Sequence, residues 1–180
     1  MIGPPLLTLG YAAAFGAGAF RGILAPFLRG EMPDPMAADW AGGVAGAAIF
    51  TAAAGLLLAA FGNGATGLFA AFAVALNLSY APAKAGCIAA GCCTARRPLG
   101  LAGHLVDLRV AEIGLSAVAL GLTALVWPFG LRAAASIGIA AHVAIRLVSR
   151  HARAGFDRRS LLGGQEFAPL ALCLGLAVTL

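Results

Sequence analysis

Long apolar runs, each broken by a short polar segment or by glycine and proline, fill almost the whole chain. A helix that crosses the hydrocarbon core of a bilayer needs about 20 mostly apolar residues. Of the 180 residues, 61% are hydrophobic and only 11% are charged, whereas roughly a quarter of the residues of a soluble domain are charged. The sequence therefore predicts an all-α integral membrane protein.

The breaks between the runs predict a bundle of about six transmembrane helices in one domain, residues 1–180. The predicted spans are residues 5–27, 40–61, 66–83, 106–127, 131–148 and 164–180. The segment Glu31-Met-Pro-Asp-Pro35 cannot continue a helix because of its prolines. No basic region precedes the first apolar run, so we expect that run to remain as a helix and not to be a cleaved signal.

The net charge of +5 comes from cations in short connections between the predicted spans. Such cations set membrane topology and contact lipid headgroups, so we expect membrane lipid as a partner and no nucleic acid. Most of them fall in the first, third and fifth connections, which predicts that these connections are cytoplasmic and both termini lie outside.

The stretch from Lys84 to Arg97 holds three of the four cysteines. Cys92 and Cys93 lie close to Arg96 and Arg97, and neighbouring cations favour the thiolate form of a cysteine. The stretch therefore suits a nucleophile or a thiol-redox site, or else small residues at a tight turn. Its spacing offers no second pair of metal ligands, so no metal site is predicted.

Two further polar sets flank the predicted fourth and fifth spans. The segment from His104 to Glu112 enters the fourth span, where Arg109 and Glu112 are three residues apart and can pair on one helix face. It forms either an interfacial ion pair or part of a polar cavity. The second set is rich in arginine, whose forked guanidinium suits phosphate, and it is either a phospholipid headgroup site or a solvated loop. Its members are Arg146, Arg150, Arg153, Asp157, Arg158 and Arg159.

The order of these motifs resembles the prolipoprotein diacylglyceryl transferase family. That family carries a Tyr-Gly pair in an early span, then an Arg-x-Gly-Asn signature that reads Arg-x-Gly-Cys-Phe-x-x-Gly-Cys-Cys in many relatives, then a His-to-Glu segment and an Arg loop before Gly-Gln. Here Tyr11-Ala, Lys84-Ala-Gly-Cys-Ile-Ala-Ala-Gly-Cys-Cys93, His104 to Glu112, and Arg153 to Gln165 come in that order. Lys84 stands where the family has an arginine, and the chain is shorter than the family.

The resemblance implies a membrane transferase of the bacterial inner membrane that uses a phospholipid as substrate and needs no other cofactor. It implies that Lys84, Arg153 and Arg158 bind the lipid phosphate. It implies Glu112 or His104 as the base, and Cys92 and Cys93 as nucleophile, shuttle or structural turn. In the family the signature works at the outer face of the membrane, opposite to the side that the charge count predicts.

Two other interpretations remain open. The chain is short and its helices are rich in glycine and alanine, which favour close packing between helices. It therefore also suits a non-catalytic subunit or assembly factor that binds other membrane protein subunits. The cysteines keep a third interpretation open, a small thiol-redox membrane protein.

Overall fold

The computed structural model describes residues 4–20, 26–32, 40–89, 91, 94–95, 99–101, 104–153 and 166–180. The chain divides into two compact units. The first comprises Met1–Phe69 and Leu162–Leu180, and the second comprises Ala70–Leu161. The prediction of a single domain over residues 1–180 stays a prediction.

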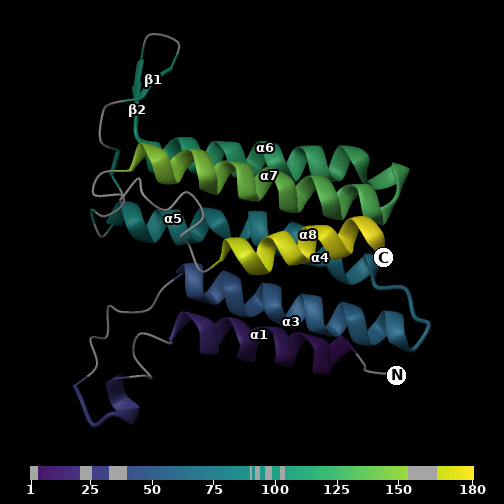
Figure 1. Cartoon of the computed structure of the whole chain (residues 1–180). Coiled ribbons are helices and arrows are strands. Elements are labelled where there is room, and N and C mark those ends of the chain that lie inside the picture. The colour runs from purple at the N-terminus through teal and green to yellow at the C-terminus, as the bar shows by residue number, and fades with distance from the viewer. Residues whose placement is uncertain are drawn as a thin grey trace. The chain divides into compact units, whose positions relative to one another are not determined.

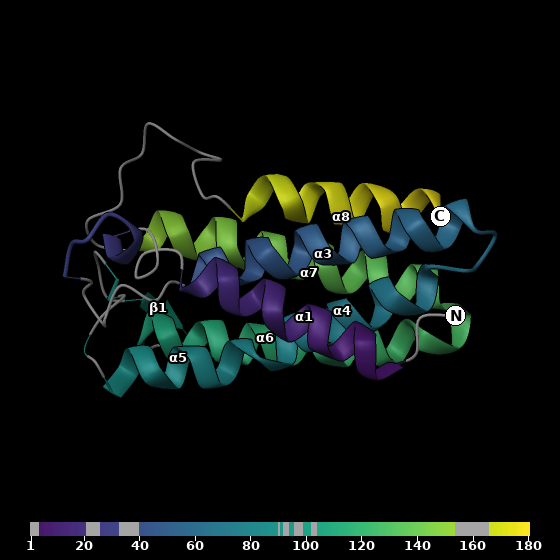
Figure 2. The same cartoon turned by 90° about the horizontal axis from the view of Figure 1, so that it is seen from below.

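The first unit contains α1 (Pro4–Ala19), α3 (Trp40–Ala60), the beginning of α4 (Thr66–Leu78) and α8 (Phe167–Thr179). Helices α1 and α3 lie side by side, and α8 packs against α3 (Figures 1 and 2). A side chain at Gly18 would collide with the carbonyl of Gly42, so a glycine there lets α1 and α3 approach closely. Cys173 is fully buried and its Sγ donates to the Ala48 carbonyl at 3.0 Å. Cys173 is thus a small residue of the core of this unit.

The second unit contains the rest of α4, then α5 (Tyr80–Ala89), β1 (Leu99–Leu101), β2 (His104–Val106), α6 (Leu108–Val126), the 3₁₀ turn η2 (Trp127–Phe129) and α7 (Leu131–Ala152). The short η2 turn makes α6 and α7 an antiparallel hairpin, and α5 packs against α6 (Figure 2). Strands β1 and β2 are antiparallel, with Leu101 opposite His104. They extend beyond the N-terminal end of α6 (Figure 1).

Four helical segments of the described chain are long and apolar enough to cross a membrane: Trp40–Ala60, Thr66–Ala89, Leu108–Phe129 and Leu131–Ala152. They correspond to the second to fifth predicted spans and make this a helical membrane protein. The described helices α1 and α8 have 16 and 13 residues, fewer than the ~20 that a span requires. The bundle of six spans therefore stays a prediction.

Two local features differ from the sequence expectation. The helical segment predicted to end at residue 83 continues to Ala89, so Lys84 and Cys87 lie on a helix. Pro82 does not end it because proline is tolerated in the first turn of a helix, where α5 places it. The β1–β2 hairpin was not predicted, since strands of three residues leave too short a pattern to recognise.

A glycine also permits the close packing of three helical segments in the second unit. A Cβ at Gly138 of α7 would lie 2.8 Å from both Ala73 Cβ of α4 and Thr123 Oγ1 of α6. The Asn77 side chain donates to the Gly138 carbonyl at 3.0 Å. Together these contacts fix the relative position of α4, α6 and α7 about two to three helical turns from the polar site described next.

Candidate functional site: a buried ionic cluster

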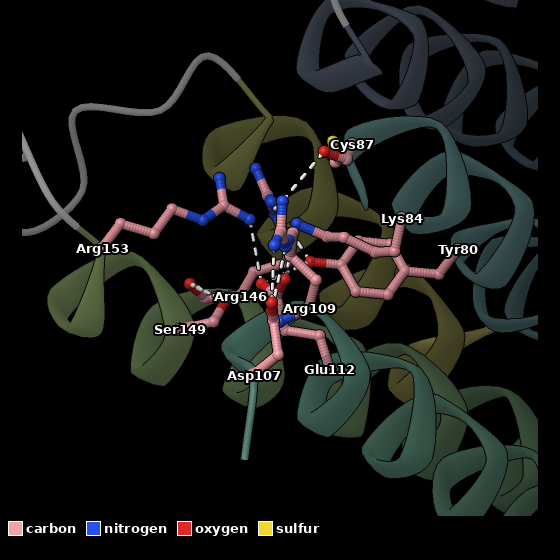
Figure 3. Close-up of polar contacts among 9 residues, drawn as sticks. All are labelled: Tyr80, Lys84, Cys87, Asp107, Arg109, Glu112, Arg146, Ser149 and Arg153. Carbon is pink, nitrogen blue, oxygen red and sulfur yellow. Dashed lines mark hydrogen bonds and ion pairs between the residues drawn. The ribbon is translucent and has the colours of Figure 1, made fainter. Parts of the chain in front are cut away.

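A wholly buried carboxylate, Glu112, is the centre of the polar site in the second unit (Figure 3). It lies on α6, little more than one turn after the Asp107 N-cap. Burying a charge is unfavourable unless it is paired and hydrogen-bonded. The partners of Glu112 come from α5 and from the C-terminal end of α7.

Two cations form ion pairs with Glu112. Lys84 Nζ of α5 lies 2.6 Å from Glu112 Oε2, and Arg153 Nη2 lies 2.9 Å from Glu112 Oε1. The side chain of Lys84 is 4% exposed and that of Arg153 is 18% exposed. The lysine is therefore enclosed between helices, whereas the arginine is reachable from the end of α7.

Tyr80 joins the three helices at the same level. Its hydroxyl donates to Glu112 Oε1 at 3.0 Å and accepts from Arg146 Nη1 at 3.2 Å. Lys84 Nζ lies 5.1 Å from the centre of the Tyr80 ring, within the range of a cation–π interaction. One tyrosine thus contacts the carboxylate and two of the cations.

Arg109 ties α5 to the start of α6. It donates to both oxygens of Asp107, at 2.9 and 2.5 Å, and to the Cys87 carbonyl at 3.1 Å. Asp107 also caps α6 by accepting from the Arg109 backbone N–H at 2.8 Å. Asp107 precedes the spanning segment, and its hydrogen bonds with Arg109 lower the pKa of its carboxyl group to about 2.

Among the residues that the structure describes, three cations and one carboxylate make up this cluster. Lys84 and Arg153 pair with the Glu112 carboxylate, and Arg146 donates to the Tyr80 hydroxyl that binds the same carboxylate. The sequence of the second unit as a whole contains ten basic and three acidic residues. A cluster with surplus positive charge among apolar helices favours an anion.

The structure brings three of the predicted site residues together: Lys84, Glu112 and Arg153 (Figure 3). His104 pairs through its backbone in β2. The predicted residues Cys92, Cys93 and Arg158 lie outside the described residues. The predicted Arg109–Glu112 pairing is replaced by the ion pairs of Arg109 with Asp107 and of Glu112 with Lys84 and Arg153.

Sequence reasoning missed the central position of Tyr80 and the contact of Arg146 with it. Tyr80 and Lys84 are four residues apart and therefore share one face of a helix. Ending the third span at residue 83 separated them. A continuous helix to Ala89 would have placed both residues on the face that meets Glu112.

Within the described ranges, no group of three His, Cys, Asp or Glu residues is arranged to hold a metal ion. Comparison of the chain with protein-family models, with curated proteins and with solved structures finds no match. The fold and the described part of the site together define a helical membrane protein in which Lys84 and Arg153 pair with the buried Glu112 and Arg146 reaches it through Tyr80.

Proposed function

We propose that this membrane protein binds the phosphate of a phospholipid at the ionic cluster and transfers a lipid-derived group to a thiol or another nucleophile. The observation that supports it is the surplus of cations around Glu112 at one end of membrane-spanning helices. Phospholipid phosphate is the abundant anion at the depth where such helices end. The transfer reaction follows from the resemblance to prolipoprotein diacylglyceryl transferases.

The proposed phosphate ligands Arg153 and Lys84 differ in how far their side chains are exposed. Arg153 is the more exposed and offers a forked donor set, so it makes the first contact with the phosphate. Lys84 lies beneath it and contributes positive charge from the interior. Glu112 holds both cations in position. The resemblance to the transferase family adds Arg158 as a further proposed ligand of the phosphate.

In the proposed reaction a thiolate attacks the lipid carbon that bears the phosphate oxygen. The new carbon–sulfur bond forms as the carbon–oxygen bond breaks, and the headgroup phosphate leaves with the electron pair. The proton of the thiol goes to a base, for which Glu112 and His104 are the candidates. Cations at the leaving phosphate stabilise the negative charge that develops there. We place this reaction in the bacterial inner membrane.

A second candidate function is that of a non-catalytic subunit of a larger membrane complex. It is favoured by the internal pairing of Glu112, whose two oxygens both have partners in the chain. A cluster satisfied in this way holds α5, α6 and α7 together without any ligand. The small-residue contact of Gly18 with Gly42 shows that helices of this chain pack closely.

An assay of headgroup release separates the two functions. Purified protein in a neutral detergent is given phospholipid labelled in its headgroup and a thiol-containing peptide, and mass spectrometry follows the released headgroup phosphate and the modified peptide. We expect both products from the wild-type chain, and loss of both in Arg153→Gln and in the double variant Cys92→Ser, Cys93→Ser.

Arg132→Gln is the matched control because Arg132 lies in the first turn of α7, at the opposite end from Arg153. It should release headgroup phosphate at the wild-type rate. No release by the wild-type chain, together with stable copurification of other membrane proteins, would support the subunit instead.

A further inference from the structure

Three buried polar side chains next to the ionic cluster lack hydrogen-bond partners. They are Asn77 through its Oδ1, Ser116 through its Oγ, and His142 through both ring nitrogens. Each residue is 1% exposed. Buried polar groups are almost always hydrogen-bonded, to the protein or to ordered water, so these four atoms require partners that the described side chains do not supply.

The three residues lie at adjacent depths of the same three-helix assembly. Asn77 precedes Tyr80 by three residues, Ser116 follows Glu112 by four, and His142 precedes Arg146 by four. Because α6 runs antiparallel to both α5 and α7, each of these steps leads about one helical turn away from the β1–β2 end. Each segment thus contributes one unpartnered polar group just deeper than the ionic cluster.

One contact joins His142 to Tyr80, and another joins Asn77 to α7. The His142 ring meets the Tyr80 ring edge to face at 5.1 Å. Asn77 Nδ2 donates to the Gly138 carbonyl, one turn from His142 on α7. Along the antiparallel pair of α5 and α6, Cys87 lies opposite Arg109 and Lys84 lies opposite Glu112. A step of three to four residues further along both helices therefore places Ser116 level with Tyr80.

We propose that Asn77, Ser116 and His142 form a binding site for ordered water inside the membrane-spanning part of the second unit. The donor and acceptor types fit water: an amide oxygen accepts, a hydroxyl donates and accepts, and a neutral imidazole does one at each nitrogen. A buried water typically makes about three hydrogen bonds, which matches three side chains from three helical segments. This inference does not depend on lipid binding or transfer.

Tyr80 separates the proposed water site from the ionic cluster. Tyr80 contacts His142 with its ring and binds Glu112 and Arg146 with its hydroxyl. Water at His142 therefore lies one residue away from the buried carboxylate.

Solid-state NMR of ¹⁵N-histidine-labelled protein in lipid bilayers tests the proposal. Magnetisation is transferred from water to the ring N–H protons of the three histidines. We expect a water cross-peak at His142, as at the exposed His151, which serves as the positive control. A resolved His142 ring signal with no water transfer, under conditions where His151 shows it, would overturn the proposal.

Ser116→Ala provides the matched variant, since alanine removes the hydroxyl without adding bulk. We expect the His142 water cross-peak to weaken or disappear, while the His151 cross-peak is unchanged. An unchanged His142 cross-peak in Ser116→Ala would exclude Ser116 from the site and contradict the three-helix arrangement. The wild-type measurement decides the central point even where the variant folds poorly.

Discussion

At the residue scale, Glu112 determines whether the cluster is tolerated inside the membrane protein. It is the one described carboxylate that faces Lys84, Tyr80 and Arg153. Removing one partner of a buried ion pair leaves an uncompensated buried charge, which costs far more than the net contribution of the intact pair. The cations of the cluster depend on Glu112 unless an external anion takes its place.

We therefore predict that Glu112→Gln lowers the free energy of unfolding by about 3–5 kcal/mol. The matched control is Glu31→Gln, which breaks the exposed Arg29–Glu31 pair, with side chains 60% and 57% exposed, and should cost less than about 1 kcal/mol. Unfolding in mixed micelles measures both. Equal losses in the two variants would contradict the cluster as described.

Asp107 gives a pH-dependent prediction outside the spanning helices. Its folded pKa of about 2 is below its unfolded value of about 3.9. Its contribution to stability is therefore fully present above the unfolded pKa and is lost as pH falls through the folded one. The stability difference between wild type and Asp107→Asn should stay constant from pH 8 to about 5 and shrink between about pH 4 and 2. A difference already lost near pH 6 would contradict the Arg109 contact.

At the element scale, close packing of the helical segments is what positions the cluster. Gly138 touches α4 and α6 at once. We predict that Gly138→Ala lowers the unfolding free energy by about 1–3 kcal/mol, because the added methyl group overpacks this contact. Gly121→Ala on α6, where an added Cβ meets nothing within 4 Å, is the control and should be neutral or stabilising. Thermal unfolding of both variants in the same detergent tests this.

The sequence predicted the elements better than the site. Apolar length alone located the four segments that can span a membrane, because the bilayer imposes that length. The partners of Glu112 were harder to predict, since they come from α5 and α7 and depend on the register between helices. Spacing along one helix suggested Arg109, but the Arg109 side chain pairs with Asp107, the N-cap residue of α6.

At the scale of the whole molecule, a membrane-spanning α6 places the β1–β2 strands and the η2 turn on opposite sides of the membrane. Cysteines placed at Gly100 of β1 and at Phe129 of η2, in a chain otherwise without cysteine, should react with a membrane-impermeant thiol reagent from opposite sides. Phe129 is 82% exposed, so burial does not block its labelling. Labelling of both positions from one side would contradict α6 as a membrane span.

Native mass spectrometry of the protein extracted from its own membranes tests the central claim, that the ionic cluster binds phospholipid phosphate. The wild-type chain and Arg132→Gln should each retain a phospholipid through mild delipidation, whereas Arg153→Gln should lose it. Equal retention by all three proteins, or retention of a lipid that lacks phosphate, would contradict the claim.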